Sequence, residues 1–242
     1  MVKPYALEPG DRIAVVAPAS PFPQQEFDDG LAELRRLGFE PTYEESVFAR
    51  TDIGYLAGSA QVRAAAIEHA WHDPDIRALV GVRGGYGSVQ LLPLLDPEMA
   101  RRARKPFIGY SDLTAILNFL ALDCGLVSFH GPTVARRLGC GDRGYDRTSF
   151  LKTLTSLEPI GEVTAPGLEV LKSGEARGVL LGGTVTQLLA SLGTPFAFDP
   201  PAGYVLLFEE VGERPYRLDR MTTQLKQANL LSRASAVVIA EL

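Results

Sequence analysis

The feature that most constrains the fold is a regular alternation of short apolar runs with longer segments of helical periodicity. Strand-like runs occupy residues 12–20, 76–82, 105–110 and 125–132, and helix-like segments occupy 24–39, 61–73, 89–95 and 112–122. Parallel strands need long crossover connections, which are usually helices, so this order predicts a parallel sheet with helices on both faces. The expected fold class is α/β, with a Rossmann-like parallel-sheet sandwich in the N-terminal part.

Three polar or glycine-rich turns follow the predicted strands. They are APAS at 17–20, RGGYGS at 83–88 and YSD at 110–112. In parallel sheets, reactive groups gather at the carboxyl ends of the strands. We therefore expect these turns to form one site rather than three unrelated loops.

The amino-acid composition changes between residues 140 and 175, where glycine, proline and charged residues are frequent. Such a segment is typical of a linker. We predict an N-terminal α/β domain over 1–140 that carries the nucleophile, a linker over 141–175 and a C-terminal domain over 176–242. In the last part, each apolar run resembles a strand, and the middle run leads into a helix.

Charge and cysteine content narrow the class of protein. The net charge of −5 argues against a nucleic-acid binder, because such proteins usually present a basic face. Cys124 and Cys140 are too few to build a disulfide framework or a zinc site by themselves, which favours a reducing compartment. Residues 1–12 lack the apolar core of a signal peptide, and no apolar stretch is long enough to cross a membrane. A cytoplasmic protein without nucleic-acid or membrane partners is the simplest interpretation.

Ser111 lies where a predicted strand turns directly into a predicted helix. Such a corner lifts a hydroxyl above the sheet and points free N–H groups of the helix start into the same space. Gly109 would relieve crowding there, and the N–H of Asp112 would open the helix. The alternative is that Ser111 or Asp112 merely caps the helix, and the motif G-x-S-x-G is absent.

The glycine-rich turn offers a second backbone donor. Gly84 and Gly85 permit a tight turn whose N–H can face a substrate. The spacing differs from G-x-G-x-x-G and no Walker lysine follows, so a dinucleotide or phosphate loop is disfavoured. An ordinary strand-to-helix turn remains an open alternative.

The histidines and carboxylates supply candidates for a general base and its orienting acid. His69 and His72 lie on a predicted helix, where surface or packing positions are expected. His130 ends a predicted strand and could reach the site or be a buried structural imidazole. Glu209 closes the apolar run 205–208, and a partly desolvated carboxylate of this kind suits the orientation of an imidazole. Solvated or salt-bridged positions near arginines are expected for the remaining carboxylates of this region, Glu210, Glu213 and Asp219.

These segments, in this order, resemble the LD-carboxypeptidases. This serine peptidase family is also called muramoyl-tetrapeptide carboxypeptidases, and it includes microcin self-immunity proteins. The matching segments are GDRIAVVAPAS, YLAGSAQVR, RGGYGSVQLLPLLD, FIGYSDLTAIL, FHGPTV, GVLLGGTVTQL and LLFEEVGERPYRLDRMTTQL, which together cover nearly the whole chain.

The resemblance implies an N-terminal α/β sandwich, a smaller β-rich C-terminal domain, and a Ser-Glu-His triad that needs no metal or other cofactor. It assigns Ser111 as the nucleophile and Glu209 as the triad acid. It assigns the backbone N–H groups of Asp112 and Gly85 to the oxyanion hole. The implied reaction releases the terminal D-alanine from an L,D-linked tetrapeptide of recycled cell wall, in the cytoplasm, and the implied assembly is a homodimer.

Two departures from the family pattern leave other functions open. Thr184 stands where the family has an asparagine. The family's histidine belongs to a motif beyond the segment that matches 234–242, and the C-terminal domain is therefore expected to be incomplete. None of the three histidines present aligns with it, and the 242-residue form is expected to be weakly active or inactive. The alternatives are a muropeptide-binding homologue without activity, an enzyme with His130 as its base, and an amidase like the self-immunity proteins that acts on an acyl-sulfamoyl adenylate. The turn 211–214 has no aromatic residue to stack on an adenine, which disfavours the last.

Overall fold

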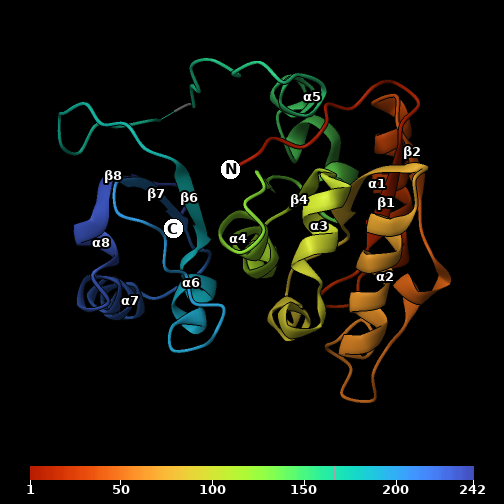
Figure 1. Cartoon of the computed structure of the whole chain (residues 1–242), viewed down its shortest axis with the longest axis horizontal. Helices are drawn as coiled ribbons and strands as arrows, with labels where there is room; N and C mark the ends of the chain where they lie inside the picture. The colour runs from red at the N-terminus through yellow and green to blue at the C-terminus, as the bar shows by residue number, and fades with distance from the viewer. Residues whose placement is uncertain (166) are drawn as a thin grey trace. The chain divides into compact units, whose positions relative to one another are not determined.

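The computed structural model describes residues 1–165 and 167–242 and divides the chain into two compact units, Met1–Leu157 and Glu158–Leu242. Figure 1 labels the main elements of both. Among the described residues, no helix has the length and apolar character that a bilayer crossing requires.

The first unit is built on a five-stranded parallel sheet with the strand order β2-β1-β3-β4-β5. The strands are β1 (Arg12–Val16), β2 (Glu40–Thr42), β3 (Ile76–Gly81), β4 (Phe107–Gly109) and β5 (Phe129–His130). The strand order reverses between β1 and β3. In open parallel sheets, ligand sites form beside this switch point, at the carboxyl ends of the strands.

Helices connect these strands, as the periodicity predicts. They are α1 (Gln24–Arg36), α2 (Ala60–His72), α3 (Pro97–Ala103), α4 (Thr114–Leu122) and α5 (Arg147–Thr155). Short 3-10 segments are η1 (Glu45–Phe48), η2 (Ser88–Leu94), η3 (Ser111–Leu113) and η4 (Leu138–Arg143). The segment 89–95, predicted to be helix-like, forms the 3-10 turn η2, because Pro93 inside it has no N–H for an α-helical hydrogen bond.

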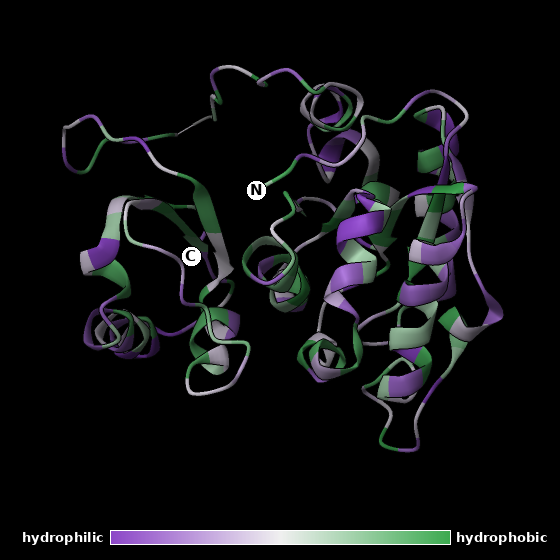
Figure 2. Cartoon of the chain, in the orientation of Figure 1, coloured by the Kyte–Doolittle hydropathy of each residue, from purple (hydrophilic) through white to green (hydrophobic). Residues whose placement is uncertain are grey.

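Both faces of the sheet are covered, so the α/β prediction is confirmed. One core joins Phe27 and Leu34 of α1 to Ile13 and Val80 of the sheet, with Phe150 of α5 against them. On the other side, α2 contacts β1 and β3, and it lies beside α3 (Figure 1). Figure 2 shows that α1, α2 and α3 each carry hydrophilic as well as hydrophobic residues, as helices with one buried face should.

Residues 141–157 fold with the first unit, although the sequence indicated a linker over 141–175. Helix α5 lies in this segment and buries Phe150 and Leu154. The N–H of Leu7 also donates to the carbonyl of Leu154 over 2.8 Å. The composition is loop-like, but these few apolar side chains are enough to fix the segment. The functional domain limits remain a prediction.

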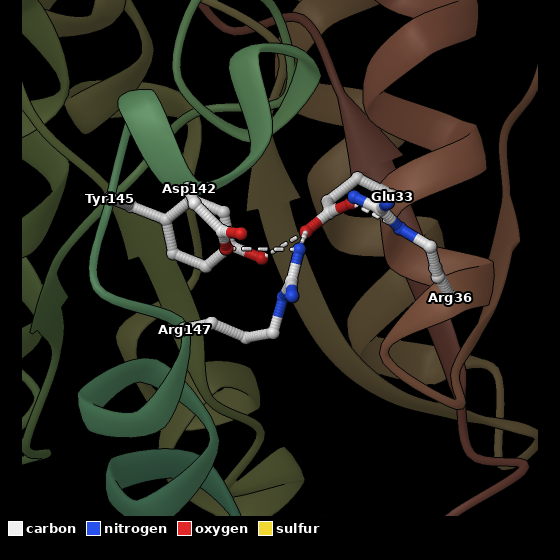
Figure 3. A network of polar contacts seen from close by, with 5 residues as sticks. All are labelled: Glu33, Arg36, Asp142, Tyr145 and Arg147. Carbon is white, nitrogen blue, oxygen red and sulfur yellow. Dashed lines mark hydrogen bonds and ion pairs between the residues drawn. The ribbon is translucent and has the colours of Figure 1, made fainter.

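A polar network around Glu33 holds the same segment against α1 (Figure 3). The Glu33 side chain is 3% exposed and accepts hydrogen bonds from the Tyr145 hydroxyl, from Arg36 and from Arg147, the last at 3.0 Å. Arg147 also pairs with Asp142 at 3.1 Å. Burial acts to raise the pKa of the Glu33 carboxyl, but the three donors outweigh it and lower the pKa.

The second unit contains a three-stranded parallel sheet of order β6-β7-β8. Its elements are β6 (Leu180–Thr184), α6 (Val185–Ser191), β7 (Tyr204–Glu209), α7 (Pro215–Gln227), α8 (Leu230–Arg233) and β8 (Ala234–Ile239). Leu206 and Phe208 of β7 are buried together with Leu188 of α6 and Leu225 of α7. The three predicted strands and the helix after the middle one are all present.

Candidate active site

Ser111 occupies a strained corner between β4 and the helical segment that begins with η3. Its backbone φ is 62°, in the left-handed region that side chains other than glycine seldom adopt. Such a conformation costs on the order of 1–3 kcal/mol and persists only where the surrounding structure holds it. A Cβ on Gly109 would lie 2.7 Å from Leu113 Cδ1 and 3.1 Å from Leu113 Cβ, so a larger residue there would require Leu113 to shift.

The glycine-rich loop lies directly against the serine. A Cβ on Gly84 would lie 2.8 Å from Ser111 Cβ, 3.0 Å from Ser111 Oγ and 3.3 Å from the amide nitrogen of Asp112. Gly85 follows with a φ of 108°. Within residues 1–165 and 167–242, the N–H groups of Gly84 and Gly85 form no hydrogen bond with another protein group. Hydrogen-bond donors therefore lie beside the hydroxyl without acceptors of their own.

The turn after β1 joins the same place. The N–H of Ser20 donates to the carbonyl of Gly84 over 3.3 Å, and the Ser20 hydroxyl accepts from the N–H of Tyr86 over 3.1 Å. A Cβ on Gly85 would lie 2.3 Å from Ser20 Oγ, so the two loops are packed as closely as backbone allows. The three predicted turns do converge. The sequence placed both turns at one site, but it did not predict the contact between Ser20 and Gly84.

Asp112 ties the start of the helix to the glycine loop. Its side chain is 1% exposed and accepts hydrogen bonds from the N–H groups of Ser88, at 2.8 Å, and of Gly87. In return, the Ser88 hydroxyl donates to the Asp112 carbonyl over 2.5 Å. Burial raises the pKa of the Asp112 carboxyl, although these hydrogen bonds and the charge of Arg63 oppose the shift. The carboxylate thus anchors a loop, which differs from the simple helix cap considered from the sequence.

Arg63 is a buried cation that the sequence analysis missed. It lies on α2 with 3% exposure. Its guanidinium donates to the carbonyls of Gly58 (3.0 Å), Pro18 (2.5 Å) and Gly87 (2.8 Å), and to Gln90 Oε1 (2.6 Å). A signal was present, because Arg63 falls in the buried stripe of α2 that continues four residues later with Ile67.

The three histidines occupy different surroundings. His69 is exposed and pairs with Glu44 at 3.0 Å, and His72 is exposed at the end of α2, as expected for surface residues. His130 pairs in register with Gly109, and its ring centre lies 6.1 Å from that of Tyr110. It is therefore near the corner, but no hydrogen bond joins it to the serine within the described parts of the chain.

In the second unit, Glu209 ends β7 as the sequence predicts. Its side chain is 7% exposed and accepts a hydrogen bond from the Thr184 hydroxyl. The two residues are partners in the β6–β7 register. Thr184, which replaces the family's asparagine, thus supports the carboxylate directly.

Glu210 is also buried, so its predicted solvated or salt-bridged position is wrong. The side chain is 7% exposed and accepts from the N–H (2.9 Å) and the hydroxyl (2.6 Å) of Thr186. The N–H groups at the start of α6 need acceptors, and a carboxylate is favourable there. Glu213 pairs with Arg217 at 2.9 Å and Asp219 is exposed, as predicted.

Comparisons with known proteins identify the family. Profiles described as the LD-carboxypeptidase N-terminal and C-terminal domains match residues 13–131 and 177–242. A Streptomyces coelicolor protein with a provisional carboxypeptidase name is 39% identical over 241 residues, which cover 99% of this chain and 77% of the relative. The microcin C7 self-immunity protein MccF of Escherichia coli is 27% identical over 250 residues, which cover 92% and 72%.

A solved structure agrees with these sequence matches. The crystal structure of muramoyltetrapeptide carboxypeptidase from Oxalobacter formigenes superposes with a TM-score of 0.81 at 29% identity, covering 96% of this chain and 77% of that one. The chain belongs to the LD-carboxypeptidase family.

Proposed function

We propose that this protein is a serine-type LD-carboxypeptidase that releases the terminal D-alanine from cell-wall-derived tetrapeptides. The observation that carries the proposal is the left-handed backbone of Ser111 at the corner after β4, pressed against Gly84. Arg104 also has a left-handed backbone, so this conformation alone does not indicate a function; at Ser111 it coincides with close contact to the glycine loop, which supports a role as nucleophile. The name of the Oxalobacter formigenes structure supports the choice of substrate.

The local geometry suits acyl transfer. In the proposed reaction, Ser111 Oγ attacks the carbonyl carbon before the terminal residue and passes its proton to a base. Negative charge develops on the carbonyl oxygen, and the N–H groups of Gly85 and Asp112 receive it. The base gives this proton to the nitrogen as the C–N bond breaks, so D-alanine leaves with a free amine and the acyl group stays as an ester on Ser111. Water, deprotonated by the same base, then attacks the ester, and the proton returns to the serine as the acid product leaves.

The base and its orienting acid complete the proposal. The family triad assigns the base to a histidine and the acid to Glu209, whose burial and Thr184 contact suit a carboxylate that fixes an imidazole. His130 is the second candidate for the base, because its register with Gly109 places it on the strand beside the corner. Replacing His130 with glutamine separates the two: turnover unchanged by this substitution excludes His130.

The direct test measures D-alanine released from a muropeptide tetrapeptide, by coupling to D-amino-acid oxidase. In a chain that includes the family's histidine motif, we expect release by the unmodified protein and none by Ser111→Ala, while Ser232→Ala, an exposed serine on α8, serves as the matched control. Full release by Ser111→Ala would refute the proposal. Calorimetry with the same peptide distinguishes a binding homologue, which would bind the tetrapeptide with no release.

A self-immunity-like amidase is the second candidate function, favoured by the likeness to MccF. Hydrolysis rates of an aminoacyl sulfamoyl adenosine and of the tetrapeptide distinguish the two functions, because only an amidase of this type would hydrolyse the adenosine compound faster than the tetrapeptide. We further propose a cytoplasmic location, which the two unpaired cysteines Cys124 and Cys140 support, and a homodimeric assembly, which sedimentation can test.

A further inference from the structure

The glycine loop is held by hydrogen bonds on both sides of Gly84 and Gly85. Before them, Arg83 donates to the carbonyl of Pro21 over 2.9 Å. After them, the N–H of Tyr86 donates to Ser20, and the N–H groups of Gly87 and Ser88 donate to the Asp112 carboxylate. The residues around Gly84 and Gly85, and the Gly84 carbonyl, are thus fixed by hydrogen bonds, whereas the N–H groups of these two glycines have no protein acceptor in the described residues.

Arg63 contributes the contacts that link this loop to the rest of the domain. One nitrogen, Nη1, donates both to the Gly87 carbonyl at 2.8 Å and to the Pro18 carbonyl at 2.5 Å. The same guanidinium reaches Gln90 in η2 and Gly58 before α2. It thus joins the turn after β1, the turn after β3 and the approach to α2 through one rigid, planar group.

Arg63 and Asp112 hold the peptide group between Gly87 and Ser88 from opposite ends. The arginine donates to its carbonyl, and the carboxylate accepts from its N–H. Both side chains are almost fully buried, at 3% and 1% exposure. A charged pair buried around one peptide group is expensive unless its hydrogen bonds are complete, so this arrangement fixes the orientation of the loop strongly.

We propose that Arg63 is a positioning residue of the oxyanion hole, which sets where the N–H of Gly85 points by holding the carbonyl of Gly87. The inference rests on the proposed function of Ser111. Arg63 does not touch the reacting atoms in this proposal. Its effect should appear in the stabilisation of the tetrahedral adduct and not in the binding of the unreacted peptide, because only the adduct places an oxygen between the two donors.

The test compares two ligands by calorimetry on the full chain. One is a muropeptide tetrapeptide, and the other is the corresponding tripeptide with a boronic acid in place of its terminal carboxyl group, which forms a tetrahedral adduct with serine. For Arg63→Met we expect at least about tenfold weaker boronate binding, since a misplacement of about 1 Å costs on the order of a hundredfold. Tetrapeptide affinity should stay within about twofold.

Two further variants keep the test decisive. Arg63→Lys keeps the charge but loses the planar fork, and we expect a boronate affinity between those of the unmodified protein and Arg63→Met. Arg101→Met is the matched control, because Arg101 also donates to backbone carbonyls, those of Cys124 and Asp123, at the far end of α4. It should lower the melting temperature and leave both affinities unchanged.

The outcomes separate the two proposals. If folded Arg63 variants bind both ligands more weakly by the same factor, or bind both as tightly as the unmodified protein does, the positioning role is overturned. Failure of both variants to fold also overturns it, because Arg63 would then be a general stability residue. If the unmodified protein does not bind the boronate, or if Ser111→Ala binds it equally well, the proposed function fails and the inference fails with it.

Discussion

The strain at Ser111 makes a prediction about stability that is separate from catalysis. Ser111→Ala and Ser111→Gly both remove the hydroxyl, but only glycine tolerates a φ of 62° without cost. The left-handed conformation costs a side chain about 1–2 kcal/mol. Glycine loses about 0.5–1 kcal/mol of this gain through the greater freedom of its unfolded chain. Ser111→Gly should therefore be more stable than Ser111→Ala by about 1 kcal/mol.

Urea denaturation at neutral pH provides the measurement. Trp71 is the sole tryptophan of the chain and is 4% exposed in α2, so its fluorescence reports the unfolding of the first unit. The expected difference corresponds to about 2–4 °C in melting temperature for a chain of this size. Both variants should lack turnover, because neither retains the hydroxyl.

A second left-handed position supplies the matched control. Arg104 has a φ of 49° at the end of α3, away from the corner, and Arg104→Gly against Arg104→Ala measures the same backbone effect. If this pair shows the gain and the Ser111 pair does not, the serine corner is not strained in solution. Backbone strain would then no longer support Ser111 as the nucleophile.

Three further predictions concern the buried carboxylates and the glycine loop. Glu33→Gln should lower stability by about 2 kcal/mol at neutral pH. Because folding lowers the pKa of Glu33, its contribution is present above the ordinary value of 4.5 and is lost as the pH falls through the folded value, so variant and unmodified protein should converge in acid; a constant difference would contradict this. Thr184→Val should reduce D-alanine release about tenfold or more because it removes the hydroxyl that donates to Glu209, whereas Thr184→Ser should retain it, and equal rates would argue against the contact. Gly84→Ala should abolish release, because its Cβ would meet the nucleophile, while Gly174→Ala, with open space around it, should have no effect; activity in the first variant would show that the loop lies elsewhere.

The fold and the place of the site were predictable because both follow from local periodicity. Apolar runs such as Ile76–Gly81 and the helical pattern of Gln24–Arg36 fix strand and helix, and a parallel sheet gathers its strand ends at one edge. Ser111 could be found because it sits at such an end. The place of residues 141–157 in the first unit could not be predicted, because their composition is that of a loop and only the burial of Phe150 and Leu154 fixes them.

The missed residues act over long distances in the sequence. Arg63 bonds to Pro18, 45 positions away, and to Gly87, 24 positions away, and no local pattern records either contact. Glu210 was misplaced for the same reason, because its acceptor role depends on the start of α6 beside it. Sequence patterns identify a charged residue, but whether water or a buried donor surrounds it depends on the tertiary structure.

The hydrogen bonds of the glycine loop bear on the role proposed for the corner at Ser111. The N–H groups of Gly84, which is buried, and of Gly85, which is exposed, have no protein acceptor among the described residues. Arg63 and Asp112, both buried, hold the peptide group between Gly87 and Ser88 in this loop. By contrast, the N–H of Tyr86 in the same loop donates to the Ser20 hydroxyl. If Ser111 is the nucleophile, the carbonyl oxygen of the substrate would lie where the N–H of Gly85 could donate to it, which is the role proposed for this group.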